Sequence, residues 1–161
     1  MATSNPPAYR DAFVAVASKV TGITVLELEA TGLVDSHAGL FLTILDASGN
    51  SDQFINAIET LAADPNPAKA IPGAMKDAFF GPLLSNLICL WYLGEWLQLP
   101  AGWYVHGTQP PIDTSTIPSP LAYAQAFAWR DAGAHPPGSR PTGYGGWALP
   151  PVMANTQGNG S

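Results

Sequence analysis

The chain has 161 residues, of which 47% are hydrophobic and only 11% are charged, with a formal net charge of -6. Ordinary soluble domains carry about 25% charged residues, so the low charge favours either a membrane protein or a large permanent protein interface, where Lys, Glu and Asp are depleted. Nucleic-acid binding is not expected, because phosphate neutralisation requires clustered cations and the six Lys and Arg residues are scattered.

The front of the chain predicts short amphipathic helices. The segment from Tyr9 to Val20 repeats apolar residues at the spacing of one helical face, and Gly22 follows it as a C-cap. A second helix is predicted between Leu33 and Ala47, because Ser-Gly-Asn at 48–50 then breaks the pattern as a turn would. The residues expected on the buried faces are Phe13, Val16, Ala17 and Val20 in the first helix and Leu40, Phe41, Ile44 and Leu45 in the second.

A third helix is predicted to begin at a cap formed by Asp52 and to end before the breaker sequence Asp-Pro-Asn-Pro at 64–67. Its expected buried residues are Phe54, Ile55, Ile58 and Leu61.

The fourth predicted helix, from Ala74 to about Leu97, is apolar nearly all round, which predicts burial on nearly all sides. Three short helices would not cover it, so part of its surface is expected to contact another protein or the C-terminal segment. Gly81 and Pro82 predict a kink or a break into two shorter helices. Polar residues interrupt the apolar run, which argues against a membrane span; they include Ser85, Asn86 and Glu95.

From Pro100 onward the sequence carries four charged residues but many aromatic residues, prolines and glycines. Aromatic residues are scarce in disordered tails, and prolines prevent long helices and central strands. The predicted fold is therefore mainly α: a small domain of about four helices at 1–99, then an extended arm rich in Pro, Gly and aromatic residues at 100–154. That arm is expected to pack on a partner and on the helical domain, and residues 155–161 are expected to fray.

Little in the sequence indicates catalysis or metal binding. Cys89 is the single cysteine, so this chain alone forms no disulfide, zinc cage or iron–sulfur site. His37 lies two residues after Asp35, but no further ligand has a supporting spacing, and His106 and His135 are predicted loop or interface residues. Gly-Tyr-Gly-Gly at 143–146 lacks the strand and helix of a phosphate loop. No signal peptide is evident near Met1.

A family resemblance rests on three features in order: the amphipathic segment from Phe13 to Gly22, the sequence Leu-Trp-Tyr-Leu-Gly at 90–94, and the aromatic, proline-rich end from Tyr123 to Pro150. That end includes Pro-Pro-Gly at 136–138 and Gly-Tyr-Gly-Gly-Trp-Ala at 143–148. Over roughly residues 12–151 the chain resembles the small subunits of membrane-associated, FAD-dependent sorbitol, fructose and glucose dehydrogenases.

The resemblance implies a subunit without an active site or cofactor of its own. In that family a large flavoprotein subunit of the glucose–methanol–choline type holds FAD and oxidises the sugar or alcohol. A cytochrome c subunit often accepts the electrons, so haem c or an iron–sulfur cluster elsewhere in the complex is compatible with the resemblance. The implied location is the periplasm, or the membrane through partner subunits, although a cytoplasmic location stays open. Family members commonly carry a twin-arginine export signal, and no Arg-Arg pair lies near Met1.

Aromatic residues are the expected anchors of the partner interface, because large obligate interfaces centre on them. Trp91 and Tyr92 are equally compatible with the core of this chain alone. The interface residues predicted are Trp91, Tyr92, Trp96, Tyr123, Trp129, Tyr144 and Trp147.

Two other functions are compatible with the composition. A stand-alone carbohydrate-binding module would stack Trp and Tyr side chains on sugar rings, although such modules are usually rich in β-strands. A small independent enzyme would need an acid and a base in a recognisable arrangement, which the sequence does not display.

Overall fold

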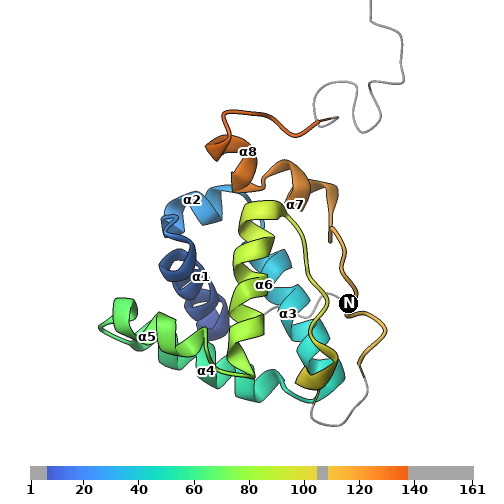
Figure 1. The fold of residues 1–161 in the computed structure, drawn as a ribbon. Coiled ribbons are helices and arrows are strands. Elements are labelled where there is room, and N and C mark those ends of the chain that lie inside the picture. The colour runs from blue at the N-terminus through green and yellow to red at the C-terminus, as the bar shows by residue number, and fades with distance from the viewer. Residues whose placement is uncertain (1–6, 105–108, 138–161) are drawn as a thin grey trace, which may run out of the picture.

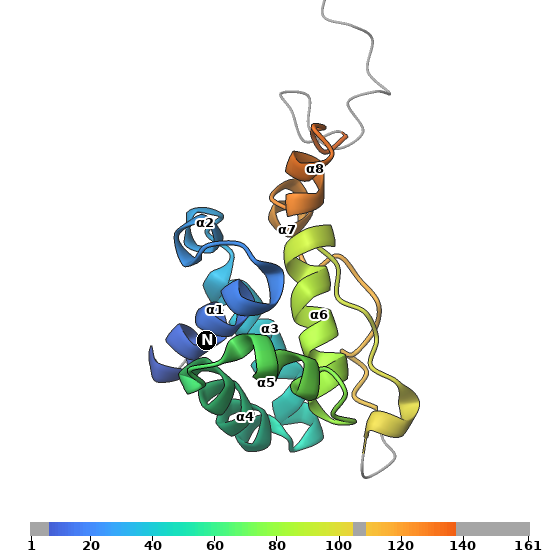
Figure 2. The same ribbon diagram turned by 60° about the vertical axis from the view of Figure 1, so that its left-hand side comes forward.

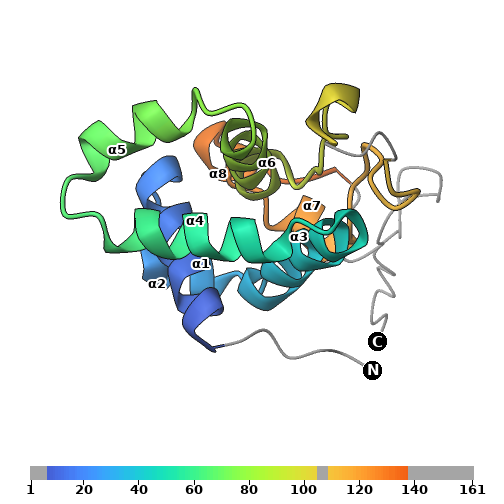
Figure 3. The ribbon, with the colours of Figure 1, turned by 90° about the horizontal axis from the view of Figure 1, so that it is seen from below.

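The computed structural model describes residues 7–104 and 109–137, and these form a mainly helical fold, as predicted. Figure 1 shows α6 standing at the centre, with α1 and α3 beside it and α4 crossing its lower end. Figure 3, seen from below, shows α4 running across α1 and α3 while α5 lies apart on the outside. The helices are α1 (Pro7–Thr21), α2 (Val25–Ala30), α3 (Val34–Ser48), α4 (Ser51–Ala63), α5 (Pro67–Ala74), α6 (Phe80–Leu93), the 3-10 helix η1 (Ala101–Trp103), α7 (Pro120–Ala124) and α8 (Phe127–Asp131).

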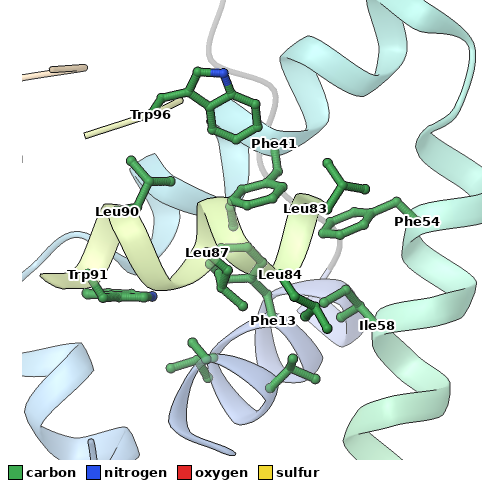
Figure 4. Close-up of a cluster of buried hydrophobic side chains, with 14 of the residues drawn as sticks. Phe13, Phe41, Phe54, Ile58, Leu83, Leu84, Leu87, Leu90, Trp91 and Trp96 are labelled. Carbon is green, nitrogen blue, oxygen red and sulfur yellow. The ribbon is translucent and has the colours of Figure 1, made fainter. Parts of the chain in front are cut away.

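Aromatic and aliphatic side chains from α1, α3, α4 and α6 meet in one core (Figure 4). The Phe41 ring lies at its centre, 5.3 Å from that of Phe13 in α1 and stacked at 5.2 Å on that of Phe54 in α4. Leu83, Leu84 and Leu87 of α6 are buried beside these rings. The apolar spacing that predicted α1, α3 and α4 therefore identified the faces that meet.

The first two predicted helices are confirmed together with their ends. Gly22 and Gly49 both adopt left-handed backbone angles, with φ of 75° and 73°, directly after α1 and α3. Such a conformation is strained for other residues but not for glycine. The chain therefore leaves each helix abruptly, and α4 begins only two residues after Gly49.

The prediction that Asp52 caps the third helix is wrong. The helix α4 begins at Ser51, so Asp52 lies inside its first turn, and Asn50 takes the cap position without a side-chain hydrogen bond. The other end of α4 is held by Lys19 of α1. Its Nζ donates to the carbonyl oxygens of Leu61, Ala62 and Asp64, at 3.2, 2.6 and 3.3 Å. A cation at the C-terminal end of a helix is stabilising.

The fourth predicted helix is shorter than expected. Asp77 accepts hydrogen bonds from the N–H groups of Phe79 and Phe80, so α6 begins at Phe80 and the break lies before Gly81. Pro82 falls in the first turn, where a missing N–H has no consequence. Gly94, with φ of 70°, ends the helix, and Trp96 therefore lies beyond it.

Sequence analysis missed the short helices α2 and α5, and it also missed α7 and α8 in the segment predicted to be extended. Thr24 and Glu27 form a reciprocal capping box at the start of α2, in which each side chain accepts the other residue's N–H. Pro67, interpreted as a breaker, occupies the first turn of α5. Both signals, Thr-x-x-Glu and Pro after Asn, are recognisable starts of helices.

The described part of the C-terminal segment returns along α6, on the side away from α1 (Figures 1 and 2). It runs beside residues 94–100, joins them through an antiparallel pair between Trp96 and Thr116, and then forms α7 and α8 over the end of α6. Trp103, Tyr104 and Phe127 belong to the same buried core as the helices. Residues after Pro100 therefore share one core with those before it.

Candidate partner interface

Two of the aromatic residues predicted at an interface are buried inside this chain. Trp91 is 1% exposed and Trp96 is 0% exposed. The Trp91 ring packs edge-on against that of His37 of α3, with centroids 4.8 Å apart, and Trp96 packs edge-on against Phe41 at 5.0 Å. Trp91 therefore belongs to the core of this chain, as the alternative prediction stated. An interface proposal therefore has to rest on other residues.

Tyr92 is half-buried and ties α6 to the end of α1. Its hydroxyl donates a hydrogen bond of 3.0 Å to the carbonyl oxygen of Thr21. This bond leaves only part of the ring for another molecule.

Tyr123 and Trp129 form one half-buried unit on α7 and α8. Their rings pack edge-on with centroids 5.2 Å apart, and the indole Nε1 of Trp129 donates to the carbonyl oxygen of Tyr123 at 2.9 Å. The unit keeps some exposed surface while its polar groups are held in place. Of the predicted interface residues, Tyr144 and Trp147 lie outside the described part of the chain.

Asp113, which sequence analysis did not single out, fixes the returning segment to the residues that follow α6. It is fully buried, and its carboxylate accepts from the indole Nε1 of Trp96 at 2.8 Å, the Tyr104 hydroxyl at 2.6 Å and the N–H of Leu99 at 3.1 Å. The Gln109 amide donates to it as well, at 3.1 Å. Burial and the adjacent carboxylate raise the pKa of Tyr104, so its hydroxyl stays protonated and donates. A buried carboxylate with four donors holds the two segments in one register.

One backbone pair joins the two segments. Trp96 and Thr116 exchange both backbone hydrogen bonds, at 2.8 and 2.9 Å. Trp96 is buried, whereas Leu97 and Ile117, each one residue beyond this pair, are exposed. The side-chain amide of Asn86 holds the Leu97 backbone, donating to its carbonyl oxygen at 2.8 Å and accepting from its N–H at 2.7 Å. Leu97 is thus an exposed leucine on a fixed backbone.

Five large apolar side chains among the described residues 93–104 and 109–121 are exposed, and we call them the apolar surface: Leu93, Leu97, Ile112, Ile117 and Leu121. The only charged residue from Trp96 to Trp129 is Asp113, which is buried. Glu95 borders the apolar surface next to the Cys89 thiol, whose pKa is raised by burial and by that carboxylate. The described exposed residues from Leu97 to Leu121 are therefore uncharged.

Gly94 allows α7 to lie directly on the end of α6. A Cβ atom at this position would collide with the carbonyl group of Ala122 and would come within 2.9 Å of the Cα of Tyr123. Both the left-handed backbone and this close approach require glycine. The Gly of the Trp-Tyr-Leu-Gly sequence thus positions Leu121 and the Tyr123–Trp129 unit.

A shallow hollow of about 480 Å³ lies between α2 and the α7–α8 region. Arg130 of α8 forms a 3.0 Å ion pair with Glu27 of α2 across it, and its guanidinium lies over the Phe127 ring, 4.6 Å from the centroid. Trp129 and Gln125 also contribute to its wall. The hollow combines the aromatic side chains of Phe127 and Trp129 with several hydrogen-bonding groups.

His37 is buried, 1% exposed, and its environment suits a neutral ring. Its Nε2, like the Nε1 of Trp91, has no hydrogen-bond partner in the described part of the chain, and burial lowers its pKa to about 4. His135 is exposed in the loop after α8, whereas His106 lies outside the described residues.

Within residues 7–104 and 109–137, no three His, Cys, Asp or Glu side chains gather as they would around a metal ion. None of the helices described there has both the length and the apolar character needed to cross a membrane. Comparison with protein-family models, curated proteins and solved structures finds no match for this chain.

Proposed function

We propose that this chain is a non-catalytic small subunit that wraps and stabilises a FAD-dependent sugar or alcohol dehydrogenase of the glucose–methanol–choline type. The observation that carries the proposal is the neutral, apolar surface on the segment after α6. The family resemblance supplies the identity of the partner.

Exposed apolar side chains are ordinary when they are scattered, but here five of them fall within residues 93–104 and 109–121, where Asn86 and Asp113 hold the backbone of Leu97 and Leu99. Contact patches of this kind mark protein partners. The half-buried Tyr123–Trp129 unit on α7 and α8 adds exposed aromatic area at the end of the same segment. The exposed part of the half-buried Tyr92 ring adds to this area.

In this proposal FAD and the oxidised sugar or alcohol belong to the large subunit, and haem c or an iron–sulfur cluster belongs to further subunits. The small subunit contributes contact area, and it takes part in the maturation or export of the flavoprotein. The complex works in the periplasm or at the membrane through its other subunits.

The test is co-expression of the tagged chain with its genomic neighbours, followed by purification and measurement of visible flavin absorbance. We expect a stoichiometric large subunit that carries FAD and oxidises a sugar or polyol. A colourless chain that elutes alone from every co-expression would end the proposal.

A stand-alone carbohydrate-binding module is the second candidate, and the hollow between α2 and α8 favours it. Its volume lies within the range of small-molecule sites, and Trp129, Glu27 and Arg130 provide a ring and charged hydrogen-bonding groups. Titration of the isolated chain with glucose and sorbitol, followed by indole fluorescence, tests this function. Saturable quenching that disappears in Trp129→Phe would support it, and the absence of any response would exclude these two ligands.

A further inference from the structure

We infer that α5 is a flap that detaches and unwinds while the rest of the described chain stays folded. Its opening uncovers the hollow between α4 and α5, and it makes Lys69 the first point at which a protease cuts the native chain. The inference concerns this chain alone, so its test is independent of the proposed function.

The first argument is packing. The helix α5 has eight residues and none of them is buried, whereas α1, α3, α4 and α6 each place several side chains in the core. The side chains with which α5 packs on that core are half-buried: Ala70, Ile71 and Ala74. Figure 3 shows α5 lying apart on the outside of the other helices. Segments that bury so little apolar area open at a low cost in free energy.

The second argument is the helix itself. Pro72 lies inside α5 and has no N–H group to bind the carbonyl oxygen of Ala68. Asn66 takes the cap position without a side-chain hydrogen bond, and Gly73 is a poor helix former. A helix of eight residues does not persist in water without packing, so detachment and unwinding are one event.

The third argument is that both ends of the flap are held. Lys19 donates to three carbonyl groups at the end of α4, and the Asp77 carboxylate accepts from two N–H groups at the start of α6. The carbonyl group of Met75 fills the space where a Cβ atom on Gly81 would lie. Opening is therefore confined to residues 65–74 and does not spread into α4 or α6.

Opening changes the surface at one defined place. The hollow between α4 and α5 has a volume of about 580 Å³, and its wall includes Leu61 of α4 and Phe80 of α6 beside Ala70 and Ala74 of the flap. Leu61 and Phe80 are each 6% exposed in the closed chain. The flap therefore controls whether this apolar wall is open to solvent.

The experiment is limited proteolysis of the full chain with trypsin, with the cut sites identified by mass spectrometry. Trypsin cuts after Lys and Arg, and the chain has six such residues. Within residues 7–104 we expect the first cut after Lys69, because cleavage follows the population of the open form. A first cut after Lys19, which lies in the packed helix α1, would overturn the inference.

Urea separates local opening from global unfolding. Global unfolding of a small domain becomes about fivefold or more favourable in about 1 M urea, whereas opening of a short flap exposes little surface and responds weakly. We expect the rate of the cut after Lys69 to stay unchanged, once the activity of trypsin on a peptide substrate is allowed for. A rate that rises with urea in step with global unfolding would contradict the flap.

One substitution at matched positions completes the test. At Gly73 and at Gly102 of η1 a Cβ atom would meet no other atom within 4 Å, and neither backbone is left-handed. Alanine favours the helical state of α5, so Gly73→Ala is expected to slow the cut about two- to fivefold, and the control Gly102→Ala to leave it unchanged. Equal rates in both variants would overturn the inference. So would hydrogen exchange by mass spectrometry in which residues 65–74 are as protected as α4 and α6.

Discussion

The burial of His37 predicts a pH dependence of stability that one substitution removes. Burial lowers the imidazole pKa from 6.5 to about 4 in the folded chain, with no charged group contributing to the shift. The unfolded chain therefore binds a proton in a pH range where the folded chain does not. The resulting loss of stability begins as the pH falls below about 6.5, grows until about pH 4 and is constant at lower pH.

The magnitude follows from the two pKa values. One pKa unit corresponds to about 1.4 kcal/mol, so the full effect is about 3 kcal/mol, and about 2 kcal/mol of it has developed at pH 5. This is a considerable part of the roughly 5–15 kcal/mol by which domains are stable. The stability is lost because a protonated His37 ring would be buried between α3 and α6 against Trp91. The indole Nε1 of Trp91 is a hydrogen-bond donor and cannot accept a hydrogen bond from the charged ring.

The assay is urea unfolding followed by far-UV circular dichroism at pH 5 and pH 7.5, for the wild type and His37→Phe. The substitution keeps an aromatic ring against Trp91 and removes the titrating group. Carboxylates titrate alike in both chains, so their effect cancels in the comparison. We expect the free energy of unfolding of the wild type to fall by about 2 kcal/mol more than that of the variant. If the free energy of unfolding fell equally in the wild type and in His37→Phe, the reasoning would be refuted. His37 would then be exposed in solution or would have a hydrogen-bond acceptor there.

Three other substitutions test the contacts that shape the surface. Asp113→Ala removes the acceptor of several buried donors and should lower the free energy of unfolding by about 3 kcal/mol or more; chemical denaturation that shows a change below about 1 kcal/mol would contradict this account. Gly94→Ala should lower the melting temperature, because its left-handed backbone and the Ala122 carbonyl leave no room for a methyl group; an unchanged melting curve would contradict the packing of α7. Lys19→Met should cost about 1 kcal/mol of stability, whereas the exposed Lys69→Met should cost nothing measurable, and equal effects in urea unfolding would show that the carbonyl bonds of Lys19 are unimportant.

The helices that the sequence predicts well are those whose apolar periodicity decides both the element and its buried face. Phe13, Phe41 and Phe54 are such cases, since each lies on the apolar stripe of its helix and meets the others in the core. Helix boundaries depend instead on single residues: Asp77 starts α6 and Gly94 ends it. A continuous apolar run conceals both signals, which is why the predicted helix extended from Ala74 to Leu97.

The surface could not be predicted in the same way. Whether Trp96 is an anchor or a core residue depends on its pairing with Thr116 and on a carboxylate 17 residues away, Asp113. Contacts between residues far apart in the sequence produce no periodic pattern of apolar residues from which they could be predicted. Aromatic content therefore drew attention to the tryptophans, while the exposed positions proved to be Leu97 and Ile117.

The Trp-Tyr-Leu-Gly sequence at 91–94 shows why folding and partner binding need separate tests. Trp91 and Tyr92 make contacts within this chain, and Gly94 accommodates α7, so all three would be required by this fold whatever its function. Leu93, which is 50% exposed and belongs to the apolar surface, is the exception.

Leu93→Gln is therefore expected to leave thermal unfolding unchanged while it weakens retention of the flavoprotein, because its side chain is removed from a contact and not from the core. Gly94→Ala, one residue further on, should show a loss of stability before any loss of binding at low temperature. The pair is measured by melting curves of the isolated chain and by retention of flavin on the tagged complex. If Leu93→Gln destabilised the isolated chain as much as Gly94→Ala, this part of the apolar surface would belong to the fold itself, and the proposed contact surface would be reduced to the residues from Leu97 onward.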